Sequence, residues 1–114
     1  MQSRIDSGEI SLQVNPEKQR RHIIGSPQYI EGRSYLTVSE SEAQEIINRY
    51  HGTGKIRITK SGQIRETIAT NHEIGICVPQ LEGQVFITYS GTIHYSKTGT
   101  HLVPAKESKG ELSK

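Results

Sequence analysis

The sequence indicates a single α+β domain in which helices come first and an antiparallel sheet of four or five strands follows. Helix-starting patterns occur in the first half of the chain, at Asn15–Glu17 and Ser39–Glu42. From Lys55 onward, short stretches alternate apolar and polar residues, with turn residues between them. Isoleucine is the dominant apolar residue, and β-branched residues favour sheet.

Composition sets limits on the function. The chain has 114 residues, enough for one modest core, and its net charge of +2 is compatible with a nucleic-acid partner without arguing for one. The one cysteine, Cys77, leaves no pair for an intrachain disulfide and suits a reducing compartment. No apolar run is long enough to span a membrane and no signal peptide follows Met1, so we expect a cytoplasmic location.

The N-terminal part contains the first helix. Residues 1–8 are polar and are expected to be a flexible lead-in to a domain at 9–105, in which Glu9–Val14 alternates as a short strand would. With Asn15 as N-cap, the helix is predicted to run over Pro16–Ile24. His22 near its end suits the negative pole of the helix dipole, so a capping role and a role in a site are both open.

The second helix is the clearest element. An extended piece, Arg33–Val38, precedes the capping box formed by Ser39 and Glu42, and the helix is predicted to end at about Tyr50 or His51. Its apolar stripe is expected to face the sheet and comprises Ala43, Ile46, Ile47 and Tyr50.

The predicted strands follow. In Lys55–Thr59 the isoleucines Ile56 and Ile58 are expected to face inward, which turns Lys55 and Arg57 outward. Later strands are predicted at Gln63–Ile68, Ile74–Val78 and Gln84–Tyr89, with a turn at Pro79–Gly83, and the polar residues 106–114 are expected to be a disordered tail.

The last predicted hairpin, Gly91–Pro104, holds the sharpest functional signal. A two-residue turn at Thr98-Gly99 would place Ser96 opposite His101 and put His94 on the same face as both. A longer turn would shift the pairing and break this triangle.

This pattern suits cleavage of an RNA phosphodiester without a metal. One histidine can take the proton of the attacking 2′-hydroxyl, another can protonate the leaving oxygen, and cations such as Lys97, Lys55 and Arg57 can neutralise the phosphate. Tyr95 is among the few aromatic side chains available to stack a base. No metal or other cofactor is expected, because His22, His94 and His101 lack the close spacing typical of zinc ligands. The competing interpretation is that the histidines simply cover a solvated sheet face.

The order of motifs resembles one family over about residues 9–105. The motifs are Asn15-Pro16-Glu17, His22-Ile23, Arg33-Ser34-Tyr35-Leu36-Thr37, Ala43-Gln44-Glu45-Ile46-Ile47, Gly52-Thr53-Gly54, His94-Tyr95-Ser96-Lys97 and Gly99-Thr100-His101. They resemble the bacterial polymorphic toxin type 50 domain, found at the C-terminus of phage minor head (head morphogenesis) proteins. The resemblance implies a ribonuclease with the barnase–EndoU–colicin–RelE-like fold.

The resemblance also implies roles. His22, His94, Ser96 and His101 fall on the family's polar motif positions and are the expected catalytic residues, with Arg57, Lys97, Lys55 and Tyr95 expected to bind substrate. The implied partners are RNA, with tRNA one candidate, and a cognate immunity protein. Two other hypotheses remain open: a non-catalytic nucleic-acid-binding module and a structural domain of a phage head morphogenesis protein.

Overall fold

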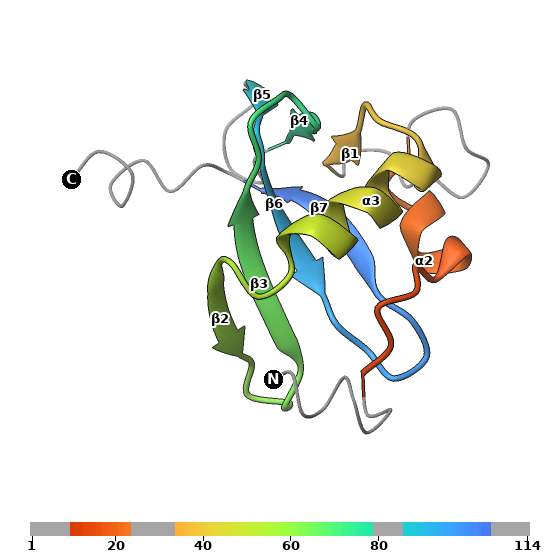
Figure 1. The fold of residues 1–114 in the computed structure, drawn as a ribbon, viewed down its shortest axis with the longest axis vertical. Coiled ribbons are helices and arrows are strands. Elements are labelled where there is room, and N and C mark those ends of the chain that lie inside the picture. The colour runs from red at the N-terminus through yellow and green to blue at the C-terminus, as the bar shows by residue number, and fades with distance from the viewer. Residues whose placement is uncertain (1–9, 24–33, 79–85, 106–114) are drawn as a thin grey trace.

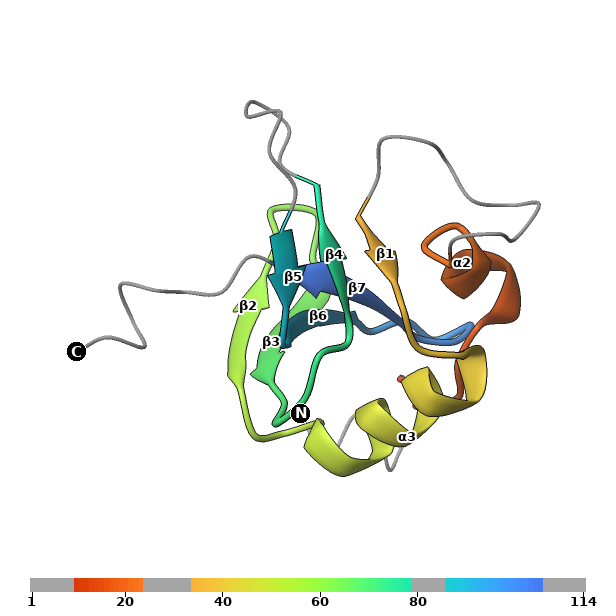
Figure 2. The ribbon, with the colours of Figure 1, turned by 90° about the horizontal axis from the view of Figure 1, so that it is seen from above.

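The computed structural model describes residues 10–23, 34–78 and 86–105. These residues form an α+β structure, as predicted, but with two antiparallel sheets instead of one. The larger sheet has the strand order β2-β3-β6-β7 and the smaller has the order β1-β4-β5 (Figure 1 and Figure 2). The elements are α2 (Pro16–Arg20), β1 (Tyr35–Leu36), α3 (Glu40–Tyr50), β2 (Lys55–Ile58), β3 (Ile64–Ala69), β4 (Gly75–Cys77), β5 (Phe86–Thr88), β6 (Ser90–His94) and β7 (His101–Ala105).

The two sheets meet at Tyr89, the one residue between β5 and β6. There the Thr88 hydroxyl accepts a hydrogen bond from the Ser90 backbone N–H (3.0 Å) and donates one to the Ala105 carbonyl (2.6 Å). This buried hydroxyl holds the chain where it passes from one sheet to the other. Apolar and polar residues alternate in the same way on both sides of Tyr89. The sequence pattern therefore gives no sign that the strands belong to two different sheets.

Helix α3 confirms the capping prediction. The Ser39 Oγ accepts from the Glu42 N–H at 3.1 Å, and the Glu42 carboxylate accepts from the Ser39 N–H at 3.1 Å. His51 is the C-cap, and Gly52 follows with a φ of 86°, a conformation that glycine adopts without strain. The predicted apolar stripe is buried over Ala43, Ile46 and Ile47.

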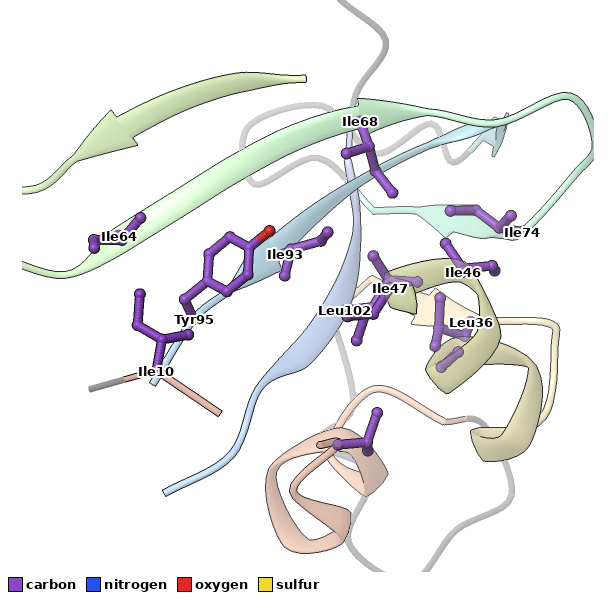
Figure 3. Packing of buried hydrophobic residues seen from close by; sticks show 12 residues of the cluster. Ile10, Leu36, Ile46, Ile47, Ile64, Ile68, Ile74, Ile93, Tyr95 and Leu102 are labelled. Carbon is purple, nitrogen blue, oxygen red and sulfur yellow. The ribbon is translucent and has the colours of Figure 1, made fainter. Parts of the chain in front are cut away.

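The main core lies between α3 and one face of the four-stranded sheet (Figure 3). Alternate residues Ile64, Glu66 and Ile68 of β3 point into this core. The inward placement of Ile56 and Ile58 is wrong, because these side chains are 47% and 60% exposed. Their strand β2 is at the edge of the sheet, whereas α3 packs against β7 at the other edge (Figure 1).

The first helix is shorter than the predicted Pro16–Ile24, since α2 ends at Arg20. The backbone then pairs with β1: the Leu36 N–H donates to the His22 carbonyl at 2.6 Å, and Ile23 bridges Leu36. A backbone that pairs with a neighbouring strand cannot also continue the helical hydrogen bonds. Tertiary pairing therefore overrides the local helix pattern.

The strand predicted at Glu9–Val14 is also absent from its described residues. Ser11 and Val14 instead make isolated bridges to Ser96 and Thr100 in the loop between β6 and β7. The segment is held there by hydrogen bonds from Ser11 N to Ser96 O (3.0 Å) and from Thr100 N to Gln13 O (2.9 Å). Val14 is nonetheless buried in the core.

The hairpin register predicted for the last two strands is wrong by two residues. His94 pairs with His101, and residues 95–100 form a loop in place of the two-residue turn. The loop backbone pairs with the N-terminal segment, so it is not available to extend the hairpin ladder. Because a shift of two residues preserves the side of each side chain, His94 and His101 still share a face.

Three predicted segments lie outside the described residues: the lead-in 1–8, the turn at Pro79–Gly83 and the tail 106–114. Among the helices that are described, none is long and apolar enough to cross a membrane.

Candidate active site

A row of charged and titratable side chains crosses the four-stranded sheet on the face opposite α3. Each member is the direct register partner of the next on the neighbouring strand, from β2 through β3 and β6 to β7. Directly opposed residues on antiparallel strands project from the same face. The row consists of Arg57, Arg65, His94 and His101.

Three histidine rings meet at the β7 end of this row. The ring centroids of His94 and His101 are 4.6 Å apart with the planes tilted by 44°. His22 stacks on His101: the two ring centroids are 5.7 Å apart and the planes are inclined by 16°. The structure therefore brings together the three histidines predicted from the sequence, although they come from three separate segments: the turn after α2, β6 and β7.

Helix α2 carries His22 to this place because Gln19 fastens the helix to β7. The Gln19 side chain is fully buried; its Nε2 donates to the Leu102 carbonyl and its Oε1 accepts from the Leu102 N–H, both at 2.8 Å. These bonds satisfy backbone groups at the free edge of β7, which would otherwise be exposed for pairing with another strand. His22 follows the helix by two residues and faces His101.

The His22 ring is held by the backbone. Its Nδ1 lies 2.9 Å from the Ser34 carbonyl, which can only accept, so Nδ1 carries the proton of this hydrogen bond. The side chain is buried, with 7% of its surface exposed. His22 is therefore part of the histidine cluster and is not a solvated cap on the end of α2.

The cluster borders a cavity of about 830 Å³ with a basic lining. Lys18 and Arg21 line it from the α2 side, Arg65 from β3 and Lys97 from the β6–β7 loop. No acidic side chain is among the described residues that line it. Such a lining suits an anion that also presents groups for proton transfer.

Arg65 was not singled out from the sequence as a site residue. Its guanidinium Nη2 donates to the Gln63 side-chain oxygen at 2.9 Å, and Gln63 also lines the cavity. Alternation along β3 predicts that both residues face away from the core, but not that His94 is the cross-strand neighbour of Arg65. Lys18 and Arg21 were missed as well; their signal was their spacing of three residues within the predicted helix, which would place them on one helix face.

Burial and the surrounding cations keep two of the histidines neutral. Burial, followed by the charge of Arg65, lowers the pKa of His94 to about 4, with smaller effects of His22, Arg57 and Lys18. Burial, followed by the neighbouring His94, lowers the pKa of His101 to about 3. Both rings are then uncharged at neutral pH in the absence of an anion.

His101 has a second feature that disfavours its charged form. Its Nδ1 is buried and has no hydrogen-bond partner among the residues that the structure describes. Protonation would place a charged N–H donor there, and a buried unpaired donor costs about 1–3 kcal/mol. The unpaired nitrogen and the depressed pKa agree that His101 is held in the neutral state.

Ser96 and Lys97 lie in the loop between the last two strands. The Ser96 Oγ accepts from the Thr98 N–H at 3.2 Å and lies 3.1 Å from the Thr98 hydroxyl, so it organises this loop. Ser96 does not sit between His94 and His101, but it and the exposed Lys97 both line the cavity. Arg57 lies at the far end of the row, and Lys55 is two residues along β2 and therefore on the same face.

Tyr95 borders the cavity but points away from it. Its ring packs in the main core beside Ile93, and its hydroxyl donates to the Glu66 carboxylate at 2.5 Å (Figure 3). Burial and this hydrogen bond raise the pKa of the Tyr95 phenol. A base stacking on the cavity side would not meet this ring, so its position suits support of the neighbouring His94.

Glu66 connects the site strands to the end of α3. Besides the Tyr95 hydroxyl, its fully buried carboxylate accepts hydrogen bonds from the backbone N–H groups of Gly52 (2.9 Å) and Gly54 (2.6 Å). A side chain at Gly54 would collide with the Thr67 carbonyl, because its Cβ would lie 1.9 Å from that oxygen. The Gly52–Gly54 segment is thus a connector between α3 and β2.

The described residues contain no group of three or more His, Cys, Asp or Glu side chains arranged to hold a metal ion. What they offer is three imidazoles and several cations around one cavity.

Comparison with known families gives a match over most of the chain. The family model for bacterial toxin 50 matches residues 14–104, which run from just before α2 to the next-to-last residue of β7. A search of curated proteins found no match to the chain.

Proposed function

The chain belongs to the bacterial toxin 50 family and is a bacterial toxin domain, and we propose that it acts as a metal-independent endoribonuclease. The observation that carries the proposal is the meeting of His22, His94 and His101 beside a basic cavity whose described lining has no acidic side chain. The site face of an antiparallel sheet with α3 on its other face also supports the barnase–EndoU–colicin–RelE-like fold for this chain.

The proposed reaction is an internal transfer at phosphorus. A neutral imidazole removes the proton of the 2′-hydroxyl, the 2′-oxygen forms a bond to the adjacent phosphorus, and the bond from phosphorus to the 5′-oxygen breaks. A second imidazole gives its proton to that leaving oxygen. The products are a 2′,3′-cyclic phosphate and a 5′-hydroxyl, and each proton transfer contributes about 10²–10⁴-fold to the rate.

His94 and His101 are the proposed proton-transfer pair. Their lowered pKa values leave both neutral in the free enzyme, which suits a base but not an acid. A phosphate in the cavity brings negative charge to the rings and raises their pKa, so that the pair takes up one proton together with the substrate. Which ring carries it is decided by where the leaving oxygen lies.

The other site residues have supporting roles in the proposal. Arg65, Lys18 and Arg21 neutralise the phosphoryl oxygens, whose charge rises in the transition state. His22 is the third site histidine, stacked on His101, and Ser96 offers a hydroxyl at the cavity wall. The set proposed to bind substrate consists of Arg57, Lys97 and Lys55, with Tyr95 supporting His94 from the core side.

The test is incubation of the purified protein with total RNA in EDTA. The expected result is fragments that end in 2′,3′-cyclic phosphate, lost in His94→Gln and His101→Gln. His72→Gln is the matched control, because His72 is exposed in the loop after β3. A 2′-O-methyl group on the attacking nucleotide should block cleavage at that linkage only. Cleavage that survives both site substitutions, or that needs added metal, would overturn the mechanism.

The same experiment separates the two other hypotheses. Intact RNA that is bound in a salt-sensitive manner would indicate a non-catalytic nucleic-acid-binding module. Neither cleavage nor binding would favour a structural domain of a phage head morphogenesis protein.

We also propose two partners. Cellular RNA, with tRNA as a candidate, would place the activity in the cytoplasm of a producing or target cell. A cognate immunity protein would inhibit by covering the basic cavity, so its contact surface should be rich in Asp and Glu.

A further inference from the structure

Arg57 belongs to the row of site side chains but lies beyond the cavity. It is the register partner of Arg65, yet it is not among the residues that line the cavity. Its side chain is exposed and forms no hydrogen bond or ion pair with any described residue. A cation held on the face of the site without a carboxylate partner is available for an anionic ligand.

The spacing of the strands places Arg57 too far out for the same phosphate. Neighbouring strands lie about 4.8 Å apart, so Arg57 is about 10 Å from His94 along the sheet, with Arg65 between them. The electrostatics agree, since Arg57 contributes less than Arg65 to the lowered pKa of His94. Arg65 is thus the arginine close enough to contact a phosphate held by the histidine pair. Arg57 lies one strand further from the histidines.

We propose that Arg57 binds the phosphate next to the scissile one, so that the site takes a single strand of RNA at least three nucleotides long. This inference rests on the proposed ribonuclease function for the identity of the scissile phosphate. Phosphates repeat once per nucleotide, and a row of cations leading away from the histidines matches that repeat. The strand would run across β3 and β2, while the recessed cavity receives the reacting linkage.

The test compares substrates that differ by one phosphate. One is a dinucleoside monophosphate, and two are trinucleotides with the extra phosphate on either side of the cleavable linkage, the other linkage being blocked by 2′-O-methylation. We expect the wild-type protein to prefer one trinucleotide over the dinucleotide. Arg57→Ala should reduce that preference, measured as the ratio of the two kcat/KM values, by about tenfold. The preferred trinucleotide also reports the direction of the bound strand.

The matched control is Arg49→Ala, which removes an exposed arginine from α3 on the other side of the sheet. It should leave the preference at the wild-type value. A preference unchanged by Arg57→Ala, or reduced equally by Arg49→Ala, would overturn the proposal.

A binding experiment separates this inference from the ribonuclease proposal. With a fully 2′-O-methylated trinucleotide that cannot be cleaved, Arg57→Ala should lower the slope of log affinity against log salt by about 0.7, the value of one phosphate contact on a single strand. If the slope falls but no RNA is cleaved by the wild type, the phosphate site stands and the ribonuclease is refuted. If RNA is cleaved and the slope does not change, the phosphate site is refuted alone.

Discussion

Acidification should destabilise this protein between about pH 7 and pH 5, before most carboxylates are protonated. The pKa of His94 is lowered to about 4 and that of His101 to about 3, whereas both are close to 6.5 in an unfolded chain. Between these values the unfolded chain binds protons that the folded protein does not. Stability therefore increases with pH through this window and is lost as the pH falls below about 6.5.

The magnitude follows from the window. At pH 5 each ring lowers the free energy of unfolding by at most about 2 kcal/mol. This value corresponds to the difference of about one and a half units between pH 5 and the pKa of histidine in the unfolded chain. The two rings together would give about 4 kcal/mol, and their partial exposure and mutual contact reduce this to about 2–3 kcal/mol. The burial of the rings and the nearby cations cause the loss, with Arg65 the largest charge effect on His94.

The assay is urea unfolding at about pH 7.5 and pH 5. His94→Gln and His101→Gln should each remove part of the loss between the two pH values, because glutamine does not titrate. His72→Gln, on an exposed loop, should retain the wild-type loss. Equal stability of the wild type at both pH values, or imidazole resonances of both site histidines titrating near 6.5, would refute the account of the site as a neutral, desolvated pair.

Three substitutions test the contacts that hold the site in place, each measured by urea unfolding at neutral pH. Gln19→Leu leaves the buried Leu102 backbone groups unpaired and should cost about 1–3 kcal/mol; RNA cleavage should fall further than the unfolded fraction explains, since α2 carries His22. Ser39→Ala removes the N-cap of α3 and should cost about 1 kcal/mol without altering cleavage by the folded protein. Glu66→Gln places an amide group against backbone donors and should cost about 2–3 kcal/mol. A loss below about 0.5 kcal/mol in any of the three would contradict the role given to that contact.

The local patterns of the chain were sufficient for the elements whose signals are local. The capping box at Ser39 and the alternation of β3 both predict what the structure contains. The predicted helix through Ile24 failed because its last residues have a tertiary partner in β1 that no local pattern announces. The predicted burial of Ile56 and Ile58 was wrong for a related reason. Alternation assigns each residue to a face of the sheet, but whether that face is covered depends on where α3 packs.

The candidate site shows how far face assignment alone can go. The predicted hairpin register was wrong, yet His94 and His101 share a face because the error was an even number of residues. Ser96 was more sensitive, since the shift moved it out of the ladder and into the loop. A register error of one residue would instead have turned one histidine toward the core. The predicted proximity of the pair therefore depends on whether the register shift is even or odd, more than on the exact turn.

Arg65 could not be placed beside His94 from the sequence. That neighbourhood depends on the pairing of β3 with β6, two strands separated in the chain by β4 and β5 of the smaller sheet. The same strand order puts Arg57 on the far side of Arg65 and makes a continuous row from four separate segments. A cation on β2 acts on a histidine of β6 only through this order. Pairing β2 elsewhere would leave every residue in the chain unchanged but would remove Arg57 from the row.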